Sequence, residues 1–321
     1  MSVALAGAVV FALLANPGLE SESAAGEPSN APAAEGQRLR LRSVPIEQRA
    51  PLPFETSGGL MFFRAVLRDR ECWALLDSGS GRSLMDLELA RSLELPLEPE
   101  TAKVRTATGE LETWRSADVA VRVPGQFEMQ HPRLAAVDMS AVSRSSGREV
   151  QFVLGADTLS QLAVVVDPKT QTLRFGPGGS FKPPAGALRV ELGSEMPQIT
   201  LKIGAESVKV VVDTGFNGTV SLSPGPWSRV FPGDAHTGTA ISAGGDGKVF
   251  ARRTGRVKEI GIGPLLLADV VIQERPATRG DGLIGMGILG KFRFVMDMKA
   301  GGMWLFGIPA PAPAAASGSR E

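Results

Sequence analysis

The sequence predicts an all-β protein built from two tandem lobes of similar plan. Gly occurs 38 times and Pro 23 times in the 321 residues, so the chain turns often. Between those turns stand many short runs rich in Val, Leu and Ile, with few segments of helical period, and this pattern favours short β-strands. Most important, one short stretch occurs twice: an apolar run that ends in Asp, a hydroxyl residue and Gly.

The repeated stretch places an aspartate at the end of each of two strands. The first copy, at positions 74–80, reads ALLDSGS, and the second, at positions 210–218, reads VVVDTGFNG. Asp is depleted in strands, so a strand that ends on Asp twice needs a physical reason. Two carboxyl groups brought together share a proton and activate a water molecule. The sequence therefore predicts Asp77 and Asp213 as one catalytic pair.

The spacing of later landmarks indicates that the two halves are duplicated. Gly155 follows Asp77, and Gly285 follows Asp213, at nearly the same distance along the chain, and each Gly ends an apolar-apolar-Gly segment. In both halves, an Asp that ends the next strand follows that Gly at an identical interval. Two unrelated all-β domains would not agree at several places, so we interpret the halves as repeats.

The N-terminal segment 1–25 is interpreted as a signal peptide, so we expect export to the periplasm or the cell exterior. Positions 3–15 form an apolar run of the length of a signal-peptide core, too short to span a bilayer, and small residues follow it. No Lys or Arg precedes the run, which departs from the usual signal pattern. The alternative is a frayed apolar N-terminus.

The rest of the chain divides at breaks in composition. Segments rich in Ser, Ala, Pro or Gly are predicted to be disordered or to link domains. The predicted divisions are a disordered spacer (26–37), an N-terminal lobe (38–175), an inter-lobe linker (176–186), a C-terminal lobe (187–308) and a disordered tail (309–321).

Charge and residue counts exclude several classes of function. Lys plus Arg and Asp plus Glu both number 34, so the formal net charge is zero and no basic field attracts nucleic acid. His131 and His236 are far apart in the sequence, and we expect both on the surface or in loops. Cys72, the one cysteine, excludes an intramolecular disulfide and a cysteine-rich zinc site. We interpret it as a core residue, with a Cys–His nucleophile pair as the alternative, and expect no metal and no cofactor.

The motif and its surroundings resemble the aspartic proteases. The resemblance rests on the strand–Asp–(Ser/Thr)–Gly turn, a hairpin downstream and an apolar-apolar-Gly segment further along each half. It is closer to the compact retropepsin-like lobe than to the longer pepsin lobe, and both copies together cover about positions 38–308. Bacterial retropepsin-like proteins carry a turn similar to DTGFNG at 213–218. The resemblance implies two β-barrel lobes related by a pseudo-twofold axis, with the active site between them.

The resemblance also implies an activity, an aspartic-type endopeptidase. One of Asp77 and Asp213 would act as general base on a bound water, and the other as general acid toward the substrate carbonyl. The substrate would be a polypeptide. Because both half-sites lie in one chain, a monomer should suffice. The terminal strands, near 39–45 and 303–308, are predicted to form the sheet that joins the lobes.

Several residues are expected to support the pair. Ser78 and Thr214 should hydrogen-bond across the lobes, and the glycines should allow close approach of the backbone. Ser80 should hydrogen-bond the carboxylate of its own lobe, whereas Phe216 occupies the equivalent position in the second lobe, so the two carboxyl groups should differ in basicity. The complete supporting set is Ser78, Gly79, Ser80, Thr214, Gly215, Leu154, Gly155, Ile284 and Gly285.

Two hairpins, at about positions 103–115 and 238–253, are predicted to be flaps that close over a substrate. The sequence has no Tyr, the residue of the pepsin-like flap. Trp114 is a candidate replacement, and an ordinary half-buried strand Trp is the alternative. The substrate-binding candidates in the flaps are Ala107, Thr108, Gly109, Trp114, Gly244 and Gly245.

Two other interpretations compete with the enzyme. In one, the aspartates only cap turns in a duplicated β-barrel, because Asp is common at turns. In the other, the protein is a catalytically inactive peptide-binding or adaptor module of the same fold. Both motif aspartates and both motif glycines are present, which favours the enzyme.

Overall fold

A computed structural model describes residues 38–41, 44–234, 238–276 and 280–307, together with two short strands, β1 (Ala8–Val9) and β2 (Leu14–Ala15). The predicted signal peptide, spacer and C-terminal tail otherwise lie outside the described residues, and so does His236.

The first half of the chain contains eleven further strands and four short helices. They are β3 (Arg38–Leu41), η1 (Ile46–Gln48), β4 (Leu52–Ser57), β5 (Leu60–Leu67), β6 (Arg70–Leu76), β7 (Leu84–Asp86), α1 (Leu87–Ser92), β8 (Glu98–Arg105), β9 (Glu110–Val123), β10 (Phe127–Val137), α2 (Ser140–Ser146), β11 (Phe152–Leu154), α3 (Ala156–Leu159), β12 (Leu162–Asp167) and β13 (Thr172–Pro177).

The second half repeats this plan with local differences. Its elements are β14 (Leu188–Glu191), β15 (Gln198–Ile203), β16 (Glu206–Val212), β17 (Val220–Leu222), α4 (Pro224–Val230), η2 (Pro232–Asp234), β18 (Gly238–Ala243), β19 (Val249–Ile262), β20 (Leu265–Glu274), β21 (Gly282–Ile284), α5 (Met286–Leu289), β22 (Arg293–Asp297) and β23 (Gly302–Phe306).

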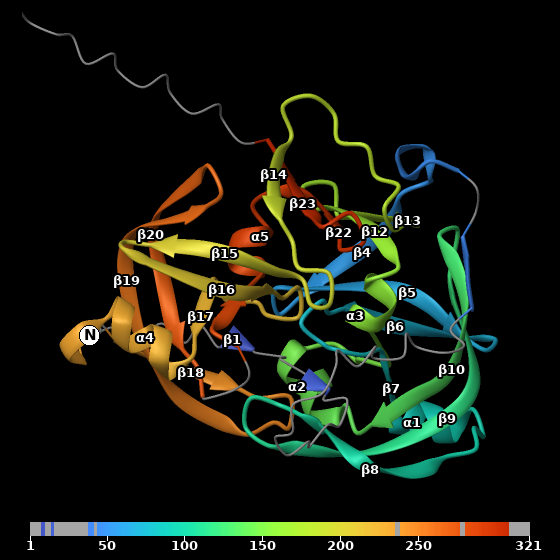
Figure 1. The fold of residues 1–321 in the computed structure, drawn as a ribbon. Helices are drawn as coiled ribbons and strands as arrows, with labels where there is room; N and C mark the ends of the chain where they lie inside the picture. Colours follow the sequence, from blue (N-terminus) through green and yellow to red (C-terminus); the bar gives the residue numbers. More distant parts are fainter. Residues whose placement is uncertain are drawn as a thin grey trace, which may run out of the picture.

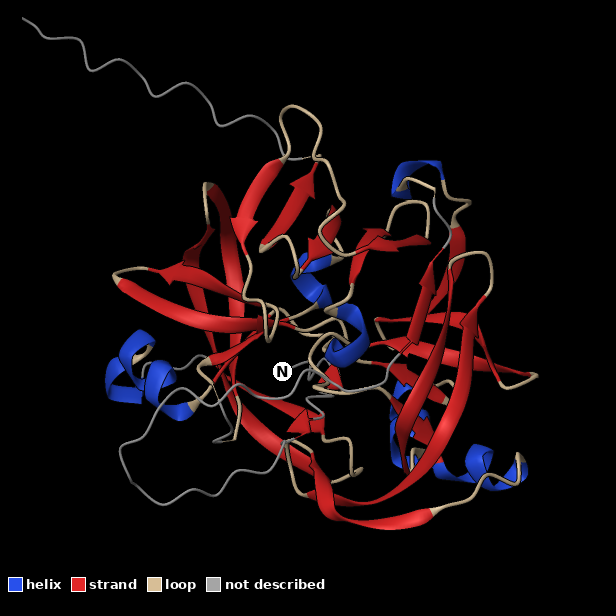
Figure 2. Ribbon diagram, turned by 45° about the vertical axis from the view of Figure 1, so that its right-hand side comes forward, coloured by secondary structure: helices blue, strands red, loops and turns tan. Residues whose placement is uncertain are grey.

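The fold is all-β with two lobes, which confirms the predicted fold class. Strands dominate and the helices are short (Figure 2). In Figure 1 most of the first half, blue to green, lies on the right and most of the second half, yellow to red, lies on the left, while β22 and β23 lie beside β12 at the top. In the second half, β19 and β20 pair with each other and close the sheet into a barrel. No described helix is both long and apolar enough to cross a membrane.

The two motif strands are central strands of their sheets. β6 lies between β5 and β11, and β16 lies between β15 and β21. A central strand covered on both faces is apolar along its whole width, whereas a strand with one wet face alternates. Accordingly, Ala74–Leu76 and Val210–Val212 are buried without interruption just before each aspartate, while β15 alternates buried and exposed side chains.

The lobes are joined by a sheet in the order β14-β23-β22-β12-β13-β4. Its central contact is the antiparallel pair β12–β22, with Val165 opposite Val295. The expectation for the terminal strands is therefore half wrong. β23 belongs to this sheet, but β3 pairs with β10 inside the first lobe, with Leu39 opposite Met129. The two strands that join the lobes are instead β12 and β22, each of which follows an apolar-Gly segment. Their buried side chains pack against one another.

Each lobe buries apolar side chains on two faces of its sheet. One cluster runs through both lobes and includes Cys72, so the cysteine is the core residue that we expected. Burial raises the pKa of its thiol to about 12. A second, inner layer of the first lobe is also apolar and is covered by Val142 of α2. The inner layer of the second lobe has a different composition, described below.

Candidate active site

Asp77 and Asp213 directly follow β6 and β16, and both side chains are fully buried. The turn after each strand folds back onto its carboxyl group. Oδ1 of Asp77 accepts hydrogen bonds from the backbone N–H groups of Gly79 and Ser80, both at 3.0 Å. Oδ1 of Asp213 accepts one such bond, from the N–H of Gly215 at 2.9 Å.

The two turns face each other across the junction between the lobes. A Cβ atom added to Gly79 would overlap the carboxyl group of Asp213, and one added to Gly215 would overlap that of Asp77. Each carboxyl group thus packs over the glycine of the opposite lobe, which explains why both turns contain Gly at this position. The second oxygen, Oδ2, of each aspartate has no hydrogen-bond partner within the described part of the chain.

Ser78 and Thr214 tie the turns together with four buried hydrogen bonds. The N–H of Ser78 donates to Oγ1 of Thr214 at 3.0 Å, and the N–H of Thr214 donates to Oγ of Ser78 at 3.1 Å. The hydroxyl of Ser78 donates to the carbonyl of Val212 at 2.6 Å, and that of Thr214 to the carbonyl of Leu76 at 2.8 Å. The network is reciprocal, so each lobe fixes the turn of the other.

The two apolar-Gly segments pass behind the turns. The carbonyl of Leu154 accepts from the backbone N–H of the first aspartate at 3.2 Å, and the carbonyl of Ile284 accepts from that of the second at 2.9 Å. At Gly155 an added Cβ would overlap the backbone of Arg82, and at Gly285 it would overlap the backbone of the second turn. These glycines therefore allow the supporting segments to press against the turns.

One contact differs from expectation. The hydroxyl of Ser80 donates to the carbonyl of Arg82 at 2.7 Å, not to the carboxylate. The backbone N–H of Ser80 reaches Asp77 instead, whereas the N–H of Phe216 bonds the carbonyl of Asp213 and no carboxyl oxygen. The two carboxyl groups therefore differ in the number of hydrogen bonds they accept, as expected. The difference comes from the backbone N–H groups of the turns and not from the hydroxyl of Ser80.

Burial and mutual proximity raise the pKa of both aspartates. Burial raises the pKa of Asp77 to about 7, against the lowering effect of the hydrogen bonds that its carboxyl group accepts from Ser80 and Gly79. Burial and the negative charge of Asp77 raise the pKa of Asp213 well above its ordinary value, while Arg275 opposes the rise. Two adjacent carboxyl groups cannot both ionise easily, and the one with two N–H donors is the better anion. The hydrogen bonds therefore favour the ionised form at Asp77 more than at Asp213.

The two flaps meet over the junction. Ala107, at the tip between β8 and β9, packs against Phe216 and Leu283 of the second lobe. The hydroxyl of Thr108 donates to Oδ1 of Asp246, which lies at the tip between β18 and β19. Asp246 also forms an ion pair with Lys248, with the two atoms 3.3 Å apart.

The remaining flap candidates have different positions. Gly109 and Gly244 lie where the tips touch, because added Cβ atoms would crowd Asp246 and Thr108 respectively. Gly245 is buried beside them. Trp114 packs against the main core on the other face of β9, so the structure places it as a half-buried strand residue and not as a cap over the site.

Sequence reasoning did not identify two residues at this site. Asn217 donates from Nδ2 to the carbonyl of Gly58 at 2.8 Å and thus adds a hydrogen bond between the lobes. Arg275 follows β20 and acts electrostatically on Asp213, although nothing in the sequence links the two positions. His131, expected on the surface, is buried on β10, where its Nε2 lies 3.2 Å from Oδ2 of Asp157.

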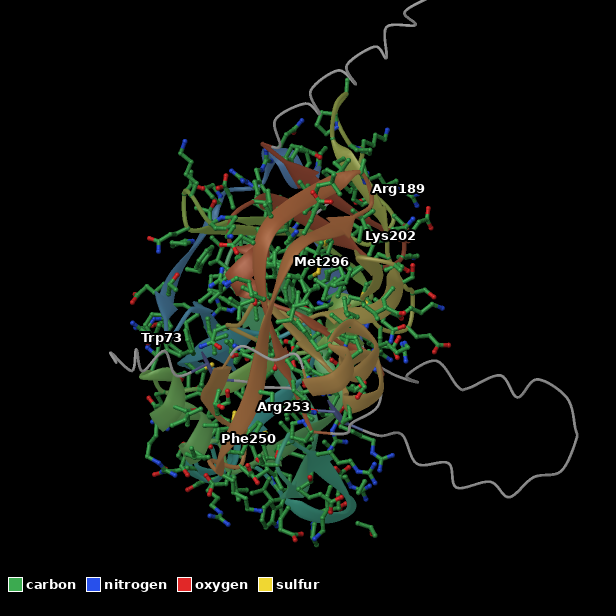
Figure 3. All side chains as sticks on the ribbon, turned by 90° about the vertical axis from the view of Figure 1, so that its left-hand side faces the viewer. Trp73, Arg189, Lys202, Phe250, Arg253 and Met296 are labelled. Atoms are coloured by element: carbon green, nitrogen blue, oxygen red, sulfur yellow. The ribbon has the colours of Figure 1, made fainter. Side chains whose placement is uncertain are left out.

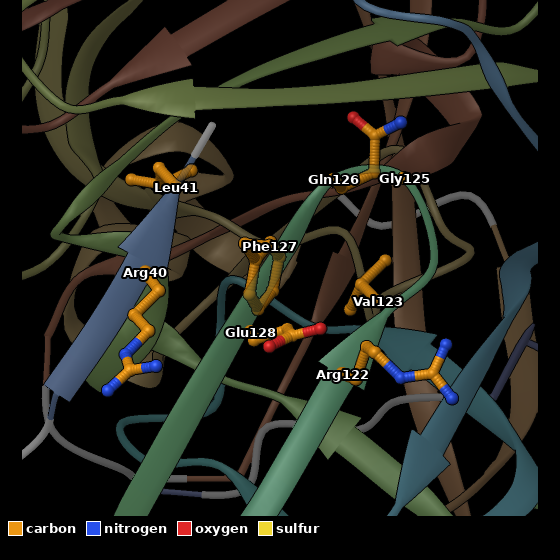
Figure 4. A pocket seen from close by; sticks show the side chains of 8 residues that line it. All are labelled: Arg40, Leu41, Arg122, Val123, Gly125, Gln126, Phe127 and Glu128. Atoms are coloured by element: carbon orange, nitrogen blue, oxygen red, sulfur yellow. The ribbon is translucent and has the colours of Figure 1, made fainter. Parts of the chain in front are cut away.

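A metal site and a surface pocket away from the two aspartates are the other possible sites in the described part of the structure. Among the described residues no group of three or more His, Cys, Asp or Glu side chains is arranged to hold a metal ion. A surface pocket of about 250 Å³ lies at the turn between β9 and β10 and is lined in part by Arg40, Arg122 and Phe127 (Figure 4). Its lining includes neither motif aspartate.

The comparison with known families agrees with this geometry. Residues 63–158 match the aspartyl protease family. The aspartyl protease match includes Asp77 and the segment Leu154–Gly155, so the resemblance to retropepsin-like proteins is confirmed there. It supports aspartic protease activity in general terms. No curated protein matches the chain.

Proposed function

We propose that this protein is an aspartic endopeptidase in which Asp77 and Asp213 act as one acid–base pair on a bound water. The observation that carries the proposal is the packing of each carboxyl group over the glycine of the opposite turn. That packing brings two buried carboxyl groups together and leaves Oδ2 of each without a partner among the described groups of the protein.

The assignment of roles follows from the unequal hydrogen bonding of the two carboxyl groups. Ionised Asp77 takes a proton from the water, whose oxygen attacks the peptide carbonyl carbon. Asp213 donates its proton to the carbonyl oxygen, so a neutral tetrahedral intermediate forms and the single negative charge of the pair moves from Asp77 to Asp213. When the intermediate collapses, its C–N bond breaks, Asp77 protonates the leaving nitrogen, and one hydroxyl of the intermediate returns a proton to Asp213. The pair ends in its starting state.

An extended polypeptide is the substrate that suits the flaps. Two short strands of the chain itself, β1 and β2, pair with the flap strands β18 and β8. This pairing indicates that both flap edges accept an extended backbone, which is how a peptide adds to the edge of a sheet. Since both aspartates come from one chain, we propose that a monomer is sufficient.

A digest of a proteome-derived peptide library tests the proposal. Wild-type protein should cleave, while Asp77→Asn and Asp213→Asn should each reduce the rate at least about 1,000-fold, because neither can complete the proton transfers. Asp269→Asn is the matched control: Asp269 is 72% exposed and forms a surface ion pair with Arg256, so cleavage should be unchanged. Binding of peptides without cleavage in any variant would instead identify an adaptor module.

A further inference from the structure

The inner face of each lobe, beneath its flap, is built from equivalent positions in the two halves. Strand pairing establishes the equivalence, because residues directly opposite each other in neighbouring strands share a face. In the first lobe the row across the sheet is Leu75, Val153, Leu84 and Ala135, and in the second lobe it is Val211, Leu283, Ser221 and Gln273.

The two inner layers differ sharply in polarity. In the first lobe the layer is apolar and closed by α2. In the second lobe, four of its apolar positions carry polar residues: Ser221 replaces Leu84, Ser242 replaces Val104, Gln273 replaces Ala135 and Arg275 replaces Val137. Arg252 occupies the place of Thr113 on the flap strand. We call Ser221, Ser242, Arg252, Gln273 and Arg275 the second-lobe cluster.

Two guanidinium groups of this cluster are buried and incompletely paired. Arg252 and Arg275 are 4% and 3% exposed. Nη1 of Arg252 donates to Oε1 of Gln273 at 2.7 Å, and its guanidinium lies 4.9 Å from the ring centre of Phe250. Nε and Nη2 of both arginines, and the hydroxyls of Ser221 and Ser242, have no hydrogen-bond partner among the residues that the structure describes. Burying charge without a partner is costly, so these donors call for an anion.

The pKa shifts of the two arginines also indicate that the second-lobe cluster lacks a negatively charged partner. Burial, together with the neighbouring positive charge of Arg275, lowers the pKa of Arg252 to about 9. Burial lowers the pKa of Arg275 to about 10, and Asp213 opposes the change. In the reactive state Asp213 carries the proton of the pair, so it does not neutralise the two arginines. The adjacent Arg253, labelled with Phe250 in Figure 3, differs because it forms an ion pair with Glu274 at 2.8 Å.

We propose that the second-lobe cluster is a subsite for a substrate carboxylate next to the scissile bond, an inference that rests on the proposed function. A carboxylate accepts the paired N–H donors that a guanidinium presents, and two serine hydroxyls can complete its shell. Ser221 lies opposite Leu283, which packs in one cluster with Phe216 of the second turn, so a group bound there lies close to the reacting carbonyl. The carboxylate comes from an Asp or Glu side chain or from a free C-terminus, since both present the same chemistry.

Cleavage-site profiling of the wild-type protein is the first test. Asp and Glu should be enriched at one position flanking the scissile bond. In a matched peptide pair, Glu→Gln at that position should lower kcat/KM at least about 30-fold, because it leaves a buried charge unpaired. Amidation of the peptide C-terminus should have no effect if the side chain is the ligand. If the free C-terminus is the ligand, amidation should cause the loss and Glu→Gln should not.

Variants that copy the first lobe provide the second test. The double variant Arg252→Thr and Arg275→Val places the first-lobe residues in the second lobe, so the preference for a carboxylate should disappear. Its thermal midpoint should rise, because two unpaired buried charges are removed. Arg256→Gln is the control, since Arg256 lies on the same strand but pairs with Asp269 at the surface. The subsite would be overturned if the wild-type protein showed no preference for a carboxylate, or if the double variant kept that preference.

Failure of the subsite and failure of the enzyme give different results. Cleavage that depends on Asp77 but shows no preference for a carboxylate contradicts the subsite alone. If no peptide is cleaved, calorimetry with the acidic peptide and its amide partner still tests the subsite on wild-type protein. Tighter binding of the acidic peptide, lost in the double arginine variant, would support the subsite without the enzyme, and equal binding of both peptides would refute it.

Discussion

Replacing Thr214 with Val should weaken the hydrogen bonds between the two lobes and loosen the alignment of the two aspartates. The two side chains have almost the same volume, but Val has no hydroxyl. In the wild type, Oγ1 of Thr214 accepts from the N–H of Ser78 at 3.0 Å and donates to the carbonyl of Leu76 at 2.8 Å. Both partners belong to the other lobe, and Thr214 and Ser78 are fully buried.

The magnitude follows from the two backbone groups that lose their partner. Each buried group left without a hydrogen bond costs about 1–3 kcal/mol, so Thr214→Val should lower the free energy of unfolding by about 2–6 kcal/mol. That is a large part of the roughly 5–15 kcal/mol that stabilises a typical domain. Thr214→Ser keeps the hydroxyl and removes one methyl group, so its cost should be about 1 kcal/mol.

Urea unfolding at fixed pH measures both variants, and peptide cleavage by the same samples reports on the alignment of the aspartates. A double-mutant cycle with Ser78→Ala should show a coupling energy clearly above zero, because the two residues share one network. The reasoning is refuted if the Val and Ser variants lose equal stability, or if the Val variant cleaves as fast as wild type.

The remaining predictions concern pH and the flaps. The pKa of Asp77 rises from 3.8 to about 7 on folding, so between these values the folded state holds more protons than the unfolded state and stability falls as pH increases. Asp77→Asn should therefore reduce the loss of thermal stability with increasing pH, and the same pH dependence of the melting temperature in variant and wild type would contradict this. The wild-type cleavage rate should increase with pH up to about 7. Asp246→Ala removes the bond to Thr108 across the flap tips, so KM should increase about tenfold. Lys248→Gln, a change of a largely exposed partner of Asp246, should alter KM far less, and equal effects would exclude the hydrogen bond as the cause.

The sequence alone determined the parts of this protein that depend on local pattern and repetition. Apolar runs before the motif aspartates predicted strands that end at Asp77 and Asp213, and β6 and β16 directly precede those residues. The repeated spacing linked Asp77 with Asp213, although they are far apart in the chain, because a duplication transfers information between distant positions. Local composition was less informative at 140–146. This segment is mostly polar in sequence, yet it folds as helix α2 around the buried Val142.

Only the tertiary structure decided what depends on contact between distant segments. The spacing of apolar residues does not predict that β12 pairs with β22 or that the hydroxyl of Ser80 donates to the carbonyl of Arg82. It also does not predict that Trp114 packs against the core. Arg252 and Arg275 are the strongest case, because in sequence they look like ordinary strand-end cations. Their burial in the inner layer of the second lobe arises from strand register across β17, β19 and β20, and register is set by pairing rather than by local composition.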